Sequence, residues 1–160
     1  MKKSLLLLLS LLLSIQNFAQ NQKAIIDNNK IIIPINTELK FNVKNNDGKL
    51  TDFELIDEAK IETPIDMMEV LKNAKRRDII SAEIDFKFSQ ADMMGSKIIV
   101  LTTLQHFTFP IIFKAKIRLK GKSDYIETSI VQVQPNVFSF EQWQNDIDSI
   151  ILYDLKRVEK

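Results

Sequence analysis

Two long runs of alternating apolar and polar residues, within residues 108–134, constrain the fold more than any other part of the sequence. In the first run, apolar side chains occupy every odd position from 109 to 119, and basic side chains occupy the even positions from 114 to 120. Alternate side chains of a β-strand point to opposite faces of its sheet. The runs are broken once, at residues 121–124, so they predict two strands of a hairpin with one face in the core and the other in water.

Similar patterns predict further strands along the chain. They cover residues 31–35, 39–43, 80–89 and 147–158. Residues 98–101 are apolar at both parities, which is typical of a central strand covered on each side. Pro34 has no amide N–H to donate to a neighbouring strand, so we expect its strand to lie at a sheet edge or to end there.

Turn residues and one helix signal connect these strands. Residues 45–48, Asn-Asn-Asp-Gly, tolerate the positive φ of a tight turn and predict a hairpin between strands at 40–44 and 49–56. Thr63 as cap, Pro64 at the first helical position and Asp66 in the first turn predict a helix of about three turns that ends at residues 75–77. We expect residues 91–97 to be a connection and residues 138–146 to be an irregular or briefly helical arm.

A parallel α/β sheet needs helices between successive strands, and the sequence offers one candidate helix. The pattern therefore predicts an all-β, mainly antiparallel fold. We expect a single β-sandwich of about seven to eight strands with one short helix at its end.

The N-terminus has the order of a secretory signal, with Lys2 and Lys3 before an apolar run. We expect a signal peptide at residues 1–19, cut after Ala19 or Gln20, and a mature domain at residues 20–160. The apolar run is shorter than the roughly 18–20 residues of a membrane-spanning helix. The expected location is thus the bacterial periplasm or the medium, without stable membrane insertion after cleavage.

Charge and cysteine content exclude several classes of protein. Loss of Lys2 and Lys3 leaves 20 basic residues against 21 acidic ones, which does not suit a nucleic-acid-binding protein. The chain has no cysteine, so disulfides, thiolate nucleophiles, cysteine-ligated zinc and a lipidated cysteine anchor are excluded. A chain of about 140 residues can bury a core without such links.

The histidine and the carboxylates of the chain do not fall into a known catalytic or metal-binding sequence pattern. His106 is the single histidine, and no nucleophile elbow or paired-histidine motif is present. Glu83 and Asp85 are candidates for a two-carboxylate hydrolase, but they fall on the predicted solvent face of a strand. The Asp146 and Asp148 pair lacks the glycine-bearing loop of a calcium site. We expect a non-catalytic protein without cofactor or metal.

The basic row of the first run is the strongest surface feature. It consists of Lys114, Lys116, Arg118, Lys120 and Lys122. Alternate residues of a strand lie roughly 7 Å apart, so the row could bind an anionic polysaccharide, a lipid head group or an acidic protein. The alternative is that Glu127, Glu83 and Asp85 on neighbouring strands neutralise the row and protect the sheet.

Aromatic residues gather in the last quarter of the sequence. They are Tyr125, Phe138, Phe140, Trp143 and Tyr153. Set flat on a surface, they would form a platform for sugar rings. The alternative is closure of the core, with Phe138 and Phe140 plugging the end of the sandwich and Trp143 packed over them.

These features favour an exported binding module for a glycan or another envelope component. The predicted ligand-binding residues are Lys114, Lys116, Arg118, Lys120, Tyr125 and Trp143. The alternative is a structural or protein-interaction module that pairs through an exposed strand, either the Pro34 strand or the last strand of the chain. A two-carboxylate hydrolase remains a third hypothesis.

Overall fold

The computed structural model describes residues 23–73 and 80–159, and it confirms the all-β, mainly antiparallel class. The signal peptide predicted at residues 1–19 lies outside the described residues. Within them, no helix has both the length and the apolar character needed to cross a membrane.

Eleven strands and one short helix are described, so the strand count predicted from the sequence was low. The strands are β1 (Ile25–Asp27), β2 (Lys30–Pro34), β3 (Thr37–Asn46), β4 (Lys49–Lys60), β5 (Ile65–Asp66), β6 (Glu83–Met93), β7 (Ser96–Gln105), β8 (Ile111–Leu119), β9 (Tyr125–Thr128), β10 (Ser139–Trp143) and β11 (Ile147–Arg157). The helix is α2 (Met67–Asn73).

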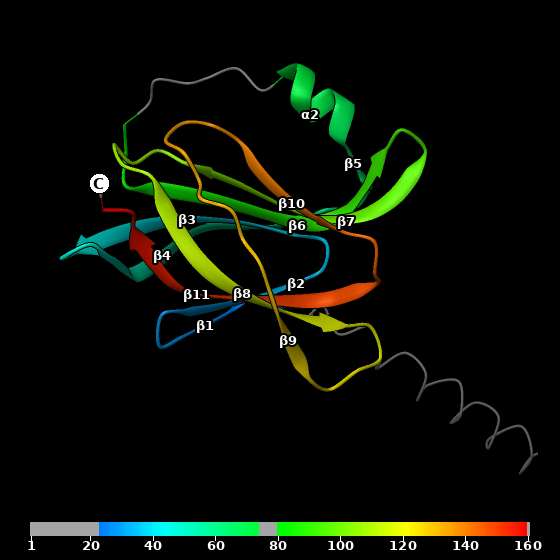
Figure 1. The fold of residues 1–160 in the computed structure, drawn as a ribbon, viewed down its shortest axis with the longest axis horizontal. Coiled ribbons are helices and arrows are strands. Elements are labelled where there is room, and N and C mark those ends of the chain that lie inside the picture. Colours follow the sequence, from blue (N-terminus) through cyan, green and yellow to red (C-terminus); the bar gives the residue numbers. More distant parts are fainter. Residues whose placement is uncertain (1–22, 74–79, 160) are drawn as a thin grey trace, which may run out of the picture.

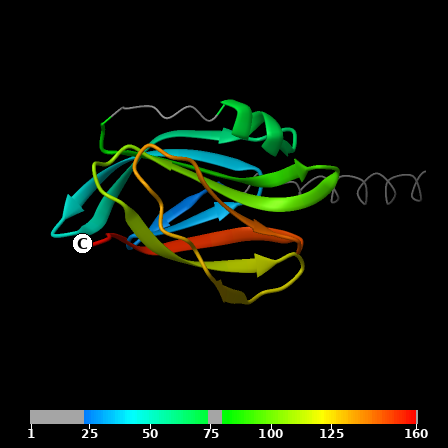
Figure 2. The ribbon, with the colours of Figure 1, turned by 45° about the horizontal axis from the view of Figure 1, so that its top comes forward.

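The strands form two layers that face each other (Figures 1 and 2). The β8 layer has the order β1-β2-β11-β8-β9, and the β6 layer has the order β4-β3-β6-β7-β10. The layers join at one corner, where Lys156 of β11 pairs with Lys49 of β4. Hydrogen bonding is therefore continuous through a single 11-stranded sheet that folds over its own core.

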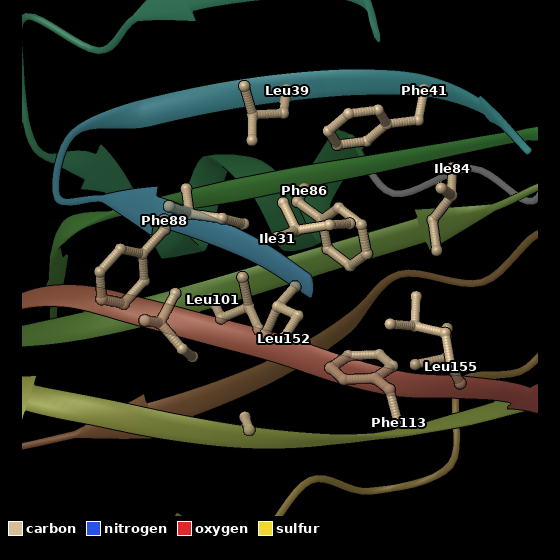
Figure 3. Packing of buried hydrophobic residues seen from close by; sticks show 14 of the residues in the cluster. Ile31, Leu39, Phe41, Ile84, Phe86, Phe88, Leu101, Phe113, Leu152 and Leu155 are labelled. Atoms are coloured by element: carbon tan, nitrogen blue, oxygen red, sulfur yellow. The ribbon is translucent and has the colours of Figure 1, made fainter. Parts of the chain in front are cut away.

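The apolar side chains of the alternating runs fill the space between the layers. The odd positions of β8 from Ile111 to Ile117 are buried, as predicted, and they meet the even positions of β6 from Ile84 to Phe88. Phe86 of β6 lies edge-on to Phe113 of β8, with ring centroids 5.9 Å apart (Figure 3). This contact ties the two layers together at the centre of the core.

The central strand expected at residues 98–101 is confirmed in β7. Ile99 and Leu101 face the main core, while Val100 packs with Met67 and Ala91 on the opposite face. Met67 begins α2, so the helix covers the outer face of the β6 layer. The run is apolar at both parities because the strand is covered on both sides.

The start of the helix differs from the prediction. Asp66 Oδ1 accepts hydrogen bonds from the amide N–H groups of Met68 and Glu69, at 2.9 and 3.1 Å, so Asp66 is the cap in place of Thr63. Ile65 and Asp66 form the short strand β5 in parallel with β6, which delays the helix. The predicted end at residues 75–77 lies outside the described residues.

Two hairpins have turns that need positive φ. Asp47 and Gly48, at φ 49° and 82°, join β3 to β4 as predicted. Met94 and Gly95, at φ 53° and 82°, join β6 to β7 in the same way. The connection expected at residues 91–97 was therefore too long, because both strands continue to the edge of this turn.

Two further predictions need correction. The arm expected at residues 138–146 contains strand β10, which pairs with β7 from Ser139 to Trp143. The second alternating run forms a strand only as β9, and beyond it Val133 makes a single bridge to Ile111. The strand that contains Pro34 ends at that residue, in agreement with one of the two expectations.

β4 pairs with β3 along its length and with β11 only at Lys49, and it carries local irregularities. Its register against β3 shifts at two places, leaving Ile56 as an extra residue at one of them, and Asp52 has a φ of 52°. Glu58 is exposed and accepts the Ala24 N–H at 2.9 Å. Bulges and charged side chains are devices that protect an edge strand from pairing.

We predict that Phe86→Ala lowers the free energy of unfolding by about 3–5 kcal/mol, because it removes a fully buried ring from the contact between the layers. Urea unfolding followed by circular dichroism measures the change. Ile126→Ala is the control, since Ile126 is half exposed and should cost less than about 0.5 kcal/mol. Equal losses in the two variants would contradict the central role of Phe86.

Candidate functional site

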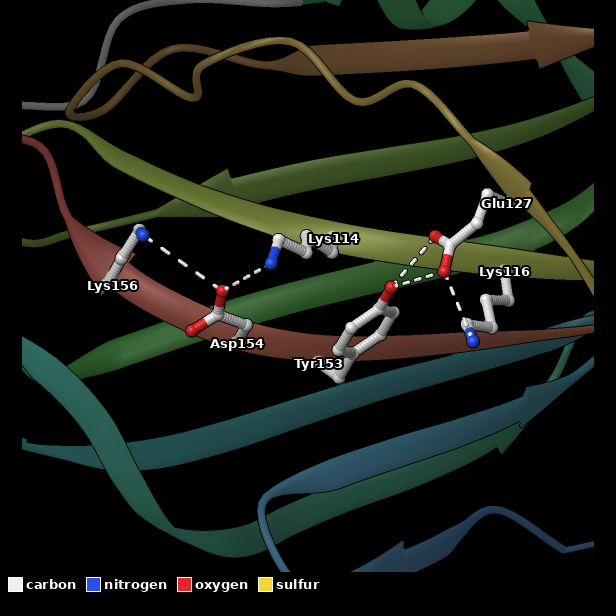
Figure 4. Close-up of polar contacts among 6 residues, drawn as sticks. All are labelled: Lys114, Lys116, Glu127, Tyr153, Asp154 and Lys156. Atoms are coloured by element: carbon white, nitrogen blue, oxygen red, sulfur yellow. Dashed lines mark hydrogen bonds and ion pairs between the residues drawn. The ribbon is translucent and has the colours of Figure 1, made fainter.

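The basic row of β8 meets acidic side chains on the outer face of the β8 layer. Lys114 Nζ lies 3.1 Å from Asp154, Lys116 Nζ lies 3.1 Å from Glu127, and Arg118 Nε lies 2.7 Å from Asp148. Figure 4 shows the first two of these pairs. We call these six residues the charge ladder.

Strand register places the partners of the ladder. β9 pairs with β8 so that Glu127 lies opposite Lys116, and β11 lies on the other side of β8. Directly opposite residues of an antiparallel pair share a face of the sheet. Parity and register therefore place Glu127 beside Lys116. On β11, Asp148 and Asp154 lie within the two register shifts against β8, and these irregularities bring their carboxylates beside Arg118 and Lys114.

Two tyrosines reinforce the ladder. The Tyr153 hydroxyl donates to both carboxylate oxygens of Glu127 at 2.8 Å, and the Lys116 ammonium lies 5.6 Å from the Tyr153 ring centroid (Figure 4). The guanidinium of Arg118 lies 5.4 Å from the Tyr125 ring centroid. Donation by Tyr153, with a further hydrogen bond from Lys116, lowers the pKa of Glu127.

The ladder supports the interpretation in which acidic side chains of neighbouring strands neutralise the basic row. Some of these acids differ from the predicted ones. Glu127 is a partner as predicted, whereas Glu83 and Asp85 lie on β6 in the other layer and were wrong choices. Asp148 and Asp154 of β11 take their place. Their pairing was not readable from the sequence, because it depends on β11 lying beside β8.

The basic residues that follow β8 lie at a turn, outside the charge ladder. Lys120 and Lys122 are exposed at the turn around Gly121, and no ion pair to either is found within residues 23–73 and 80–159. The predicted binding residues Lys114, Lys116, Arg118 and Tyr125 thus share one face, and Lys120 lies at its margin.

Trp143 is separated from that face. Its ring packs on the main core, edge-on to Phe88 with centroids 6.4 Å apart, and its Nε1 donates to Thr128 Oγ1 at 2.9 Å. Phe140 lies in register with Thr102, on the outer face of the β6 layer. The aromatic residues therefore do not form one surface, and Phe138 and Phe140 do not plug the core as one alternative supposed.

A second polar cluster lies on the β6 layer. His106 is buried, and its Nδ1 lies 2.8 Å from Asn136 Oδ1, which links the end of β7 to the turn before β10. Asp85 is partly buried, and one of its carboxylate oxygens has no hydrogen-bond partner among the described residues. Burial raises the pKa of Asp85, and the attraction of Lys40 opposes that shift.

A groove of about 500 Å³ lies where the segment from β4 to α2 crosses the outer face of the β6 layer. Its lining consists of Ile61, Thr63, Pro64, Ile65, Asp66, Glu69, Val70, Lys87, Thr102 and Phe138. Of the aromatic residues singled out in the sequence, Phe138 alone is among these. Periodicity did not reveal the groove, because it forms where irregular segments cross a sheet.

The two strands proposed for edge pairing have neighbours on both sides. Ile31 and Ile32 of β2 pair with β1 on one side and with β11 on the other. In β11, Ile150 to Leu152 pair with β2 and with β8. Among the residues that the structure describes, Ile33 and Pro34 of β2 pair with β11 alone, so the part of β2 with a free side is short. In residues 23–73 and 80–159, no three histidine or acidic side chains gather where they could hold a metal ion.

We predict that Glu127→Gln combined with Asp154→Asn flattens the loss of stability in acid. The ladder lowers the pKa of both carboxyls in the folded state, so their contribution is present above the unfolded pKa of about 4 and is lost as pH falls below it. Thermal unfolding measured between about pH 7 and pH 3 tests this. Asp124→Asn, at an exposed turn, is the control, and an unchanged slope in the double variant would count against the ladder.

We predict that Asp85→Asn raises stability at pH 7 by about 1 kcal/mol, because it replaces a negative charge that burial disfavours with a neutral amide of the same shape. The pKa of Asp85 is raised on folding, so the wild type recovers stability as pH falls and Asp85 takes up a proton. The advantage of the variant should then shrink. Urea unfolding at pH 7 and at about pH 4 measures both effects, and a less stable variant at pH 7 would refute the prediction.

Comparison with known proteins gives no relative from which a function can be transferred. No family model, no curated protein and no solved structure matches the chain. The geometry of the groove and of the charge ladder is therefore the basis for assigning a function.

Proposed function

We propose that this protein is an exported, non-catalytic binding module that holds a glycan in the groove beside α2. The basic n-region and apolar run of the N-terminal sequence support export. The groove supports binding, and it is the observation on which the proposal rests.

The size and lining of the groove suit a small saccharide. Ligand sites in proteins are typically clefts of about 300–1,000 Å³, mainly apolar, with a few polar groups that fix orientation. Here Phe138, Pro64 and Val70 supply apolar surface, while Thr102 and Glu69 supply hydrogen-bonding groups. A sugar ring has an apolar face of C–H groups and an edge of hydroxyls, and this lining complements both.

The support beneath the groove is rigid. Thr102 and Lys87 lie on β7 and β6, two central strands that pair along ten residues. Met67, at the start of α2, is anchored against Ala91 and Val100 of the same strands. A site held on packed strands binds without first ordering its own walls, which lowers the entropic cost of binding.

The charge ladder is the weaker candidate surface. An anionic polymer that binds Lys114, Lys116 or Arg118 must first displace an intramolecular carboxylate from each. That exchange replaces one ion pair with another and yields little net free energy at an exposed surface. A ligand that packs on Phe138 in the groove displaces no ion pair there.

We predict that Phe138→Ala weakens glycan binding at least tenfold, because it removes the aromatic surface of the groove. Screening the wild type on a glycan array identifies the ligand, and calorimetric titration compares the variants. Phe140→Ala is the matched control, since Phe140 is a partly exposed phenylalanine nearby that does not line the groove.

Lys116→Glu tests the charge ladder in the same assay. It reverses one cation of the ladder and leaves the groove unchanged, so we expect it to retain glycan binding. Loss of binding in Lys116→Glu, with retention in Phe138→Ala, would move the site to the β8 layer. Absence of any retained glycan for the wild type would refute the proposed function.

A further inference from the structure

We infer that the methionines beside the β6–β7 hairpin form a site for a soft monovalent cation, with Cu(I) as the biological ion and Ag(I) as its air-stable analogue. The thioethers of Met68, Met93 and Met94 bind the ion, and Met67 anchors the site. This inference goes beyond the proposed function, because none of these four residues lines the groove.

The fold brings together two methionine pairs that lie far apart in the sequence. β5 runs in parallel beside the last residues of β6. One position beyond this pairing lie Met67 and Met93, which pack in one apolar cluster. Met68 and Met94 follow them in the chain, so four methionines meet where α2 starts beside the hairpin end of β6 and β7 (Figure 1).

Exposure separates the anchor from the three proposed ligands. Met67 is 1 % exposed and fixes the start of α2 against the sheet. Met93 is partly buried, Met68 is 39 % exposed and Met94 is 82 % exposed. Because a methionine side chain is unbranched and adaptable, three thioethers in adjoining positions can turn toward one ion.

Met94 occupies a position that disfavours methionine. It has a φ of 53° and forms the hairpin turn together with Gly95, at 82°. The β3–β4 hairpin has the same backbone signs at Asp47 and Gly48, and Asp or Asn is the usual residue before glycine in such a turn. A long apolar side chain at an exposed tip supports neither the turn nor the core, so the thioether is what this position offers.

Thioether ligands select a soft ion. Sulfur ligands favour Cu(I), whereas Mg²⁺ and Ca²⁺ prefer carboxylate and carbonyl oxygens. The chain has no cysteine, so methionine supplies its only sulfur ligands. A thioether takes up no proton in the physiological range of pH, whereas an imidazole ligand loses its metal as it becomes protonated. Binding through methionine should therefore be independent of pH.

The test is calorimetric titration of the protein with silver nitrate in a buffer free of chloride. We expect one strongly bound Ag(I) per chain, with an affinity that stays constant between about pH 5.5 and about pH 7.5. In the same range we expect no binding of Mg²⁺ at this site. NMR of the protein labelled with ¹³C in its methionine methyl groups identifies the ligands, and the signals of Met68, Met93 and Met94 should shift together.

Variants separate loss of the site from loss of the fold. Met94→Asn removes one thioether and supplies a residue that accepts positive φ, so its unfolding temperature should be unchanged or higher. Its affinity for Ag(I) should fall about tenfold or more, since loss of an outer-shell partner alone costs a metal site that much. Asp47→Asn, at the same position of the other hairpin, is the matched control and should keep full affinity.

The double variant Met68→Leu with Met93→Leu keeps side-chain volume close to that of the wild type, and it should abolish Ag(I) binding. Full affinity in this variant or in Met94→Asn would overturn the inference. An affinity that falls at the lower pH, or no Ag(I) binding by the wild type, would also overturn it. Each of these outcomes leaves the glycan proposal standing, because the groove is unchanged in all of the variants.

Discussion

The structure depends on apolar contact between two layers that are parts of one hydrogen-bonded sheet. Phe86 on β6 and Phe113 on β8 meet at the centre of this contact, and Phe41 and Phe53 extend it toward β4. Because these side chains occupy one parity of each strand, the other parity points away from the core, to solvent or, on part of the β6 layer, to α2. A shift of one residue in any of these strands would expose the core.

The two outer faces that result differ in character. On the β8 layer, outward positions carry the charge ladder, whose cations and carboxylates satisfy one another. On the β6 layer, α2 and the segment before it cover part of the face and leave the groove beside Phe138. On one face the charged side chains of β8 contact acidic partners, and on the other face the sheet and the helix segment enclose a groove.

Much of this architecture could be predicted from local patterns. The alternation in β8, the double-sided run of β7 and the turn at Asp47 and Gly48 each specify their structure within a few residues. Pairings between distant strands have no such local signal. The partners Asp148 and Asp154 of the ladder, the packing of Trp143 against the core and the groove all depend on which segments meet in space. The periodicity of a single sequence does not reveal those meetings.

The irregular edge of β4 affects whether this strand can pair with a strand of a second copy of the protein. A strand of this length with a straight, apolar border would template the addition of a second chain, and then of others, into a filament. The extra residue at Ile56, the positive φ at Asp52 and the exposed carboxylate of Glu58 each interrupt that template. An edge built in this way disfavours the strand-by-strand addition of further copies.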